Sequence, residues 1–246
     1  MSAFGKLLTV ETKLFLREPT GLIFTLAVPV VVLVALGSVP SFREDNPDLG
    51  GASVIDLYVP ILIGLCLATQ AMNALPVLVA TAREQGILRR MSATPVPPSR
   101  LLAAQTLVQV GVFVLMALLL LAIGRLAFGV PLPANPAAFV VAFLLAAGAS
   151  FAVGMLLSAV LPNNRVATPV TMLIYFPMLF FAGLWLPREI MPDVINRIGD
   201  FTPLGAGVQA IRDASAGEWP SLLHVAVLLV ITVAGATAAS KLFRWV

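Results

Sequence analysis

The sequence predicts an all-α membrane protein that forms a single transmembrane domain over residues 1–246. Of the 246 residues, 59% are hydrophobic and 11% are charged, whereas an ordinary soluble domain has about 25% charged residues. Roughly 145 apolar positions would fill six or seven spans of about 20 residues each. The apolar residues occur in long charge-free runs rather than in alternating ten-residue strands, which indicates helical spans. These totals exclude a soluble enzyme, a disordered chain and a disulfide scaffold.

Six charge-free intervals define the expected spans in chain order. They are residues 22–39, 57–82, 101–124, 137–161, 166–186 and 221–240. Six spans place both termini on one side of the membrane. If that side is the cytoplasm, the inner segments carry ten Lys and Arg with three Glu, and the outer segments carry five Arg with nine Asp and Glu. This bias follows the positive-inside rule, so both termini are expected to be cytoplasmic.

Residues 4–18 read as an amphipathic helix that lies on the inner membrane surface. Lys13 and Arg17 belong to a basic stripe, and leucine and phenylalanine side chains recur on another face. Glu11 falls in the middle of the apolar face, where an unpaired carboxylate is costly. Either the helix is exposed with an imperfect face, or Glu11 turns toward the protein and meets a cationic partner.

The inner loop after the second span predicts a short helix over residues 83–94, ended by Pro95, Pro97 and Pro98. On one continuous helix, an apolar ridge would share a face with Glu84, and the arginines would lie on another. The residues concerned are Arg83, Glu84, Gly86, Ile87, Leu88, Arg90 and Met91. A charged helix with an apolar ridge suits docking into a groove on a cytosolic partner. The alternative is a plain solvated loop.

The outer segment after the fifth span is too polar to cross the membrane and too apolar for a free loop. Apolar residues recur at helical spacing over 190–198 and again over 204–211, with Pro203 between them. Two short re-entrant helices over residues 187–215, dipping into the outer leaflet, fit this pattern.

Polar and aromatic residues within the spans are the candidates for a substrate path. Gln70 and Asn73 share one helical face, as do Gln105 and Gln109. These amides either hydrogen-bond between helices or line the path. Phe176 and Phe180 lie in the outer half of the fifth span. They form an interface belt, pack in the bundle, or make a wall at a subunit seam.

No catalytic or metal site is expected in this chain. A single histidine and a single cysteine lie in separate spans, and no phosphate-binding glycine loop occurs. No basic block suggests nucleic-acid binding.

Taken together, these parts resemble the permease subunit of type-2 ATP-binding-cassette exporters of the drug or natural-product kind, over nearly the whole chain. The matching motifs are Arg17-Glu18-Pro19, Glu84-x-Gly86…Thr94-Pro95 and Gly183-Leu184-Trp185-Leu186-Pro187…Met191-Pro192…Pro203-Leu204. The resemblance implies that Arg83–Met91 form a coupling helix that docks on an ATPase subunit. It implies an outer gate at Gly183, Trp185, Pro187, Pro192 and Pro203.

The resemblance also implies the assembly: two permease copies with two ATPase subunits, ATP and Mg²⁺ on the ATPase, and no cofactor in this chain. We expect a homodimer in the bacterial plasma membrane, in contact with lipids, that exports a hydrophobic or amphipathic drug-like molecule. The alternatives are a lipid or lipid-linked glycan exporter of the same family, or an ATP-independent carrier or scramblase.

Overall fold

The computed structural model describes residues 3–17, 19–44, 46, 51–91 and 98–243, and the elements in them are all helical. In chain order they are α1 (Ala3–Arg17), α2 (Pro19–Gly37), η1 (Pro40–Phe42), α3 (Val54–Ala68), the π-helix η3 (Thr69–Ala74), α4 (Leu75–Glu84), α5 (Ile87–Met91), α6 (Pro98–Phe128), α7 (Pro136–Val160), α8 (Asn164–Phe181), η4 (Arg188–Ile190), α9 (Asp193–Asp200), α10 (Pro203–Ser215) and α11 (Leu222–Leu242). The predicted all-α class is confirmed.

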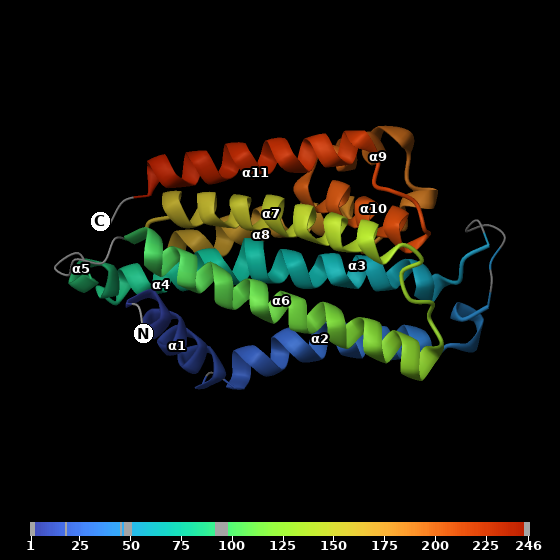
Figure 1. Cartoon of the computed structure of the whole chain (residues 1–246), viewed down its shortest axis with the longest axis horizontal. Coiled ribbons are helices and arrows are strands. Elements are labelled where there is room, and N and C mark those ends of the chain that lie inside the picture. Colours follow the sequence, from blue (N-terminus) through green and yellow to red (C-terminus); the bar gives the residue numbers. More distant parts are fainter. Residues whose placement is uncertain (1–2, 18, 45, 47–50, 92–97, 244–246) are drawn as a thin grey trace.

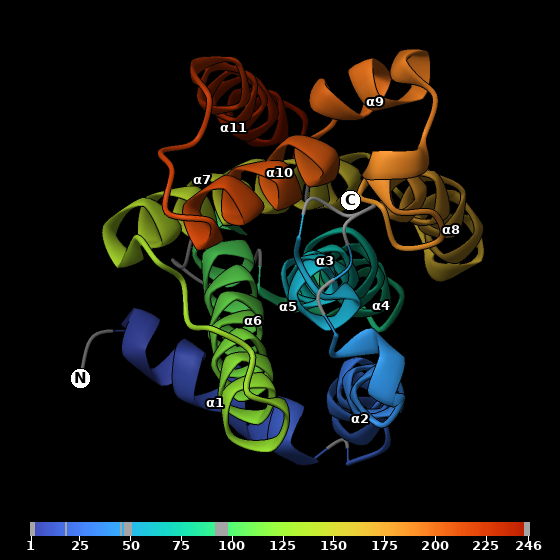
Figure 2. The same ribbon diagram turned by 90° about the vertical axis from the view of Figure 1, so that its right-hand side faces the viewer.

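The long helices run side by side along the longest axis of the molecule (Figure 1). The two termini and α5 lie at one end, which we call the inner end because the termini are expected to be cytoplasmic. The α2–α3 and α6–α7 connections lie at the opposite, outer end. Seen from the outer end, α10 lies crosswise over the bundle (Figure 2), where it packs against α3, α7, α8 and α11.

Four helices in the described residues are long and apolar enough to cross a membrane. They are Val54–Glu84, which combines α3, η3 and α4, together with Arg100–Phe128, Pro136–Val160 and Leu222–Leu242. They match the second, third, fourth and sixth expected spans. For the first expected span, the apolar helix within the described residues is Leu26–Gly37. The fifth expected span corresponds to α8, whose hydropathy is lowered by Asn164 and Arg165 at its start.

Small residues allow close packing in the centre of the bundle. Gly154 of α7 lies against the backbone of η3, so that a Cβ added at Gly154 would fall 1.9 Å from the carbonyl oxygen of Ala71. Phe113 of α6 stacks on Phe143 of α7 with ring centroids 4.4 Å apart. The single cysteine, Cys66, is buried in α3. Interfaces built on glycine and alanine are typical of helices that associate in a membrane.

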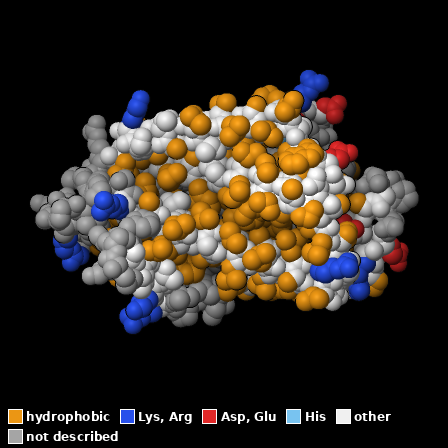
Figure 3. Space-filling view, in the orientation of Figure 1, with side chains coloured by type: hydrophobic (Ala, Val, Ile, Leu, Met, Phe, Trp, Pro, Cys, Tyr) orange, Lys and Arg blue, Asp and Glu red, His pale blue; other side chains and the backbone are white. Residues whose placement is uncertain are grey.

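The surface is divided along the long axis (Figure 3). Apolar side chains cover the middle of the visible face, Lys and Arg lie at both ends, and Asp and Glu lie at the outer end. The short amphipathic helix α1 packs against α6 at the inner end (Figures 1 and 2). Residues 4–17 of the helix expected at residues 4–18 are therefore helical, and Lys13 and Arg17 on it are exposed. Glu18 lies outside the described residues.

Candidate functional site

The expected helix over residues 83–94 is divided by a turn at Gly86, which differs from the single helix inferred from the sequence. Arg83 and Glu84 belong to α4, and α5 begins at Ile87. Gly86 has a φ of +67°, and its N–H donates to the Arg83 carbonyl at 3.0 Å. Because a left-handed residue cannot continue an α-helix, the faces assigned on one continuous helix do not hold. Residues 92–97, with Thr94-Pro95, lie outside the described residues.

Glu84 connects α4 to the start of α8. Its Oε1 accepts the backbone N–H of Asn164 at 2.9 Å, and the Asn164 side-chain amide donates to the Thr81 hydroxyl at 2.7 Å. A carboxylate at a helix N-terminus satisfies a free N–H and interacts favourably with the helix dipole. Glu84 is thus used within the chain, although its side chain is also exposed.

Arg83 makes the neighbouring connection at the inner end. Its guanidinium donates to the Leu161 carbonyl after α7 and lies over the Phe243 ring, 5.5 Å from the ring centroid. Together Arg83 and Glu84 attach the inner end of α4 to the α7–α8 connection and to the C-terminal segment.

Among the described side chains of α5, Ile87 and Arg90 are accessible to a partner. Arg90 is exposed and donates from Nη2 to the Gln85 carbonyl at 3.0 Å, and Ile87 is half-buried. Leu88 is only 1% exposed, so it packs within the chain and is not part of an exposed ridge. The side chain of Met91 is outside the described part of the structure.

The predicted path residues Gln70 and Asn73 both lie in the π-helix η3. The Thr69 hydroxyl in the same segment donates to the Leu65 carbonyl and lies 3.0 Å from the Tyr175 hydroxyl of α8. Gln70 is 1% exposed, Asn73 is half-buried, and Gln70 Nε2 has no hydrogen-bond partner among the described residues. Short π-helical segments inside α-helices are frequently found at functional sites.

Gln105 and Gln109 lie on α6, which packs against η3. Both side chains are buried, and neither Oε1 atom has a hydrogen-bond partner in the part of the chain that the structure describes. Ser150 Oγ of α7 is also buried without a hydrogen-bond partner among the described residues. Sequence reasoning missed Ser150 and Tyr175, because a serine in an alanine-rich span and a tyrosine in an aromatic run give no distinct signal. Four elements therefore bring hydroxyl and amide groups into the interior.

Glu11 of α1 faces the protein and interacts with the Gln105 side chain. The neighbour described for Glu11 is thus a neutral amide, and a cationic partner stays a prediction. Burial raises the pKa of the Glu11 carboxyl, and the hydrogen bond with Gln105 opposes that shift. Of the predicted aromatic residues, Phe176 is 51% exposed on α8 and Phe180 packs edge-on against Phe181.

At the outer end, the predicted gate residues are turn and cap residues of α8, η4, α9 and α10. Gly183 has a φ of +91° after α8, Pro187 and Pro192 precede η4 and α9, and Pro203 is the first residue of α10. The remaining predicted residue, Trp185, is 61% exposed. The range expected for re-entrant helices holds the short 3₁₀-helix η4 and the helices α9 and α10, and their re-entry into the membrane stays a prediction.

A buried arginine that sequence reasoning missed holds this region together. Arg188 is 8% exposed, and its Nη2 lies 2.5 Å from Asp200 Oδ1 and 2.7 Å from the Asn196 carbonyl. Asp200 Oδ1 is also 3.2 Å from Nε2 of His224 at the start of α11. The network fixes η4, α9 and α11 to one another.

These features define an all-helical membrane protein. Its short helix α5 is joined by the Gly86 turn to α4 and η3, a span that contains buried polar groups. This arrangement suits a transporter permease. The chain belongs to the ABC-2 family: residues 41–241 match the family model described as "ABC-2 family transporter protein". The predicted family is therefore confirmed, and it is a family of transporter permeases rather than of enzymes.

Two curated relatives extend the comparison. The chain is 28% identical over 193 residues to the "Probable multidrug ABC transporter permease YbhR" of Escherichia coli strain K12, and equally to that of strain O157:H7. Each match covers 76% of this chain and 51% of the relative. The chain thus spans about half the length of the curated relatives it matches.

Proposed function

We propose that the chain is the transmembrane permease subunit of an ATP-driven exporter in the bacterial plasma membrane. It moves a hydrophobic or amphipathic small molecule outward, and a separate ATPase subunit binds and hydrolyses ATP. In this proposal α2 and α8 join the four long apolar helices as spans, α1 lies on the inner surface, and α9 and α10 re-enter from the outside. Two copies of the chain form the path.

The observation that carries the proposal is the direct connection from α5 to η3. Only the Gly86 turn separates α5 from α4, and α4 continues without a break into the π-helix. A push on α5 by an ATPase subunit would therefore reach the buried amides of η3 through one rigid helix. The Glu84–Asn164 bond would pass the same displacement to α8. Such coupling requires two arrangements of the helices, and nucleotide binding must shift the populations of these two arrangements.

The lining of the candidate path supports a cargo that is not strongly ionic. The candidate path presents amide and hydroxyl groups of Gln70, Asn73, Gln109 and Tyr175 between apolar helices. Polar groups without partners inside a bundle are costly, so they are retained where they bind cargo or exchange partners between states. The naming of the relatives as probable multidrug permeases agrees with drug-like cargo.

The test adds negative charge to the exposed side of α5. The chain is expressed with its ATPase subunit, and ATP-dependent accumulation of the amphipathic dye Hoechst 33342 is measured in inverted vesicles. The variant Ile87→Asp/Arg90→Glu alters only accessible side chains, and Lys241→Glu is the matched control at the same end. We expect at least a tenfold loss of ATPase affinity and of dye transport in the α5 variant only.

Three outcomes would contradict the proposal. Unchanged ATPase affinity and transport in the α5 variant would remove the coupling role. Transport by the chain alone without ATP would indicate a carrier or a scramblase. ATP-driven movement of labelled lipid with no dye transport would indicate a lipid exporter.

A further inference from the structure

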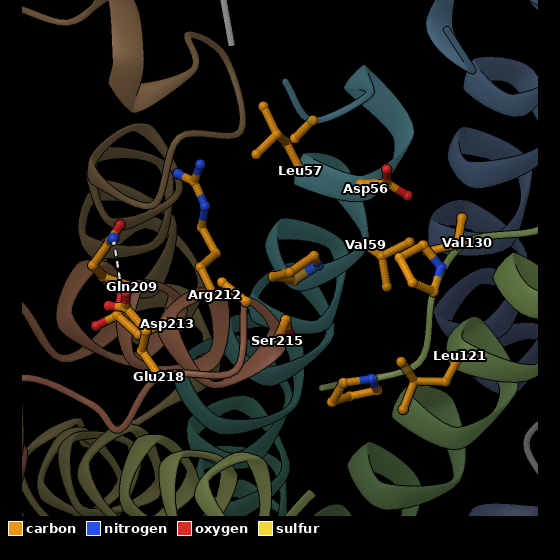
Figure 4. Close-up of a pocket in the computed structure, with 15 residues that line it drawn as sticks. Asp56, Leu57, Val59, Leu121, Val130, Gln209, Arg212, Asp213, Ser215 and Glu218 are labelled. Carbon is orange, nitrogen blue, oxygen red and sulfur yellow. Dashed lines mark hydrogen bonds between the residues drawn. The ribbon is translucent and has the colours of Figure 1, made fainter. Parts of the chain in front are cut away.

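A pocket of about 420 Å³ lies at the outer end of the molecule, outside the residues discussed so far. Its walls come from the start of α3, the end of α6 with the segment after it, and the second half of α10 (Figure 4). Val59, Leu121 and Val130 form an apolar side of the pocket. A volume of a few hundred Å³ with mostly apolar walls and a few polar groups is typical of a small-molecule site.

The polar side of the pocket carries an excess of negative charge. Asp213 and Glu218 line it, with Arg212 as the single basic residue in the lining. A third acid, Asp56, lies on the other side of the pocket, beside Val59 (Figure 4). Within the described ranges, no Lys or Arg forms an ion pair with any of these three carboxylates. In Figure 4 the Arg212 guanidinium extends away from Asp213 and Glu218.

The environment of Asp213 holds its carboxylate at the pocket wall. Gln209 Nε2 donates to Asp213 Oδ1 at 3.1 Å, and His224 Nδ1 lies 3.9 Å from Oδ2. Glu218 follows closely because its backbone N–H donates to the Asp213 carbonyl at 2.9 Å. Both acidic side chains thus come from one short, hydrogen-bonded segment that faces apolar residues of other elements.

We propose that this pocket binds an amphipathic organic cation, with apolar groups against Val59, Leu121 and Val130 and positive charge near Asp213 and Glu218. Cation binding is favourable there because no Lys or Arg of the described residues pairs with these carboxylates, and apolar side chains line the opposite side of the pocket. Asp56 adds a third negative charge from α3. The role of the pocket as the release end of the export path rests on the proposed function, whereas binding itself does not.

The test measures binding to the purified chain without an ATPase. Tetraphenylphosphonium is titrated into the chain in nanodiscs of zwitterionic lipid, and uptake by empty nanodiscs is subtracted. Tetraphenylborate, an anion of almost the same size and shape, reports the apolar contribution without the positive charge. We expect the cation to bind at least tenfold more tightly than the anion.

Variants then locate the site. Glu218→Gln should weaken phosphonium binding about threefold, and Asp213→Asn/Glu218→Gln about tenfold, with no loss of borate binding. Asp193→Asn is the matched control, because Asp193 is an exposed acid at the same end that does not line the pocket. Leu121→Ala should weaken the binding of both probes, because both contact the apolar side of the pocket.

The outcomes separate this proposal from the function proposed above. Equal binding of both probes, or equal loss in the Asp193→Asn control, would overturn the pocket while leaving ATP-driven transport untouched. Selective phosphonium binding in a chain that shows no ATP-driven transport would support the pocket and overturn the exporter. An unchanged melting temperature of Glu218→Gln ensures that its weaker binding is not due to unfolding.

Discussion

The carboxylate of Glu84 lies 2.9 Å from the backbone nitrogen of Asn164, 80 residues further along the chain. This bond joins the inner ends of α4 and α8, which both pack against η3. The residue that sequence reasoning assigned to partner docking therefore also fixes the geometry of the span that would carry the signal. A variant at Glu84 would disturb the fold and the partner surface at once.

Replacing Glu84 should destabilise the chain through the start of α8. Glu84→Ala removes a charged acceptor from a helix N-terminus, and we expect a loss of about 1 kcal/mol in the free energy of unfolding. Glu84→Gln keeps an acceptor without the charge and should lose less. Thermal unfolding in detergent measures both. Equal melting temperatures for wild type and Glu84→Ala would show that the bond contributes nothing.

Gly154→Ala should be among the most damaging single substitutions in α7. The new Cβ would stand 1.9 Å from the Ala71 carbonyl oxygen, so the π-helix and α7 must separate. Overpacking of this kind costs about 1–3 kcal/mol or more. Gly111→Ala on α6 is the control, because nothing lies within 4 Å of its Cβ position. Ala is favoured over Gly inside a helix, so the control should be as stable as wild type or more stable. A Gly154→Ala melting temperature at or above that of the control would rule out the tight contact.

Replacing the buried amides should lower transport without lowering the stability of the chain. Gln70→Leu and Gln109→Leu replace side chains that are each 1% exposed and carry an unpartnered polar atom. Replacing an unsatisfied buried polar group by an apolar one of similar size is neutral or stabilising. We therefore expect an unchanged or higher melting temperature, with dye transport lowered severalfold. Unchanged transport in both variants would remove these residues from the path.

The stability effects of substitutions at Arg188 and Asp200, which form an ion pair at the outer end, should depend on each other. Arg188→Met removes the guanidinium from the Asp200 carboxylate, whose side chain is 24% exposed, and leaves the His224 ring 3.2 Å from it. Breaking a fully buried pair costs about 3–5 kcal/mol, so we expect about 2 kcal/mol at this partly exposed pair. Adding Asp200→Asn should restore part of that loss in urea or thermal unfolding. Simple additivity of the two substitutions would argue against the pair.

The raised pKa of Glu11 predicts how the stability of the α1 contact depends on pH. A raised pKa means that folded Glu11 holds its proton more tightly than the unfolded chain does. The contribution of Glu11 is thus complete below its unfolded pKa and is lost as the pH rises through the raised folded value. Glu11→Gln should remove this slope and raise the melting temperature at neutral pH more than at pH 4. A constant difference between variant and wild type across this range would contradict the burial of the carboxyl.

The helical class and the positions of the long helices could be predicted because they depend on local hydropathy. The expected spans 101–124 and 137–161 agree closely with α6 and α7, since charges and prolines mark both ends of each. The amphipathic pattern near Glu11 likewise predicts α1. These features need no knowledge of what lies beside them in space.

Features that depend on contacts between distant segments could not be predicted. The π-helix at Thr69–Ala74 has no local sequence signal, and it is held against Gly154 from another span. Gly86 could end a helix or sit within one, and only its positive φ decides between these alternatives. The Arg188 network and the outer pocket combine residues from several elements, whose proximity the linear pattern does not contain.

The burial of Cys66 has a practical consequence for following this protein at work. As the only thiol in the chain, and one that is 3% exposed, it should react slowly with bulky maleimides. A cysteine placed at an accessible position such as Lys241 or Asp193 could then carry a dye or spin label without removal of the native cysteine. Distances between labels at the two ends could be recorded in otherwise wild-type protein.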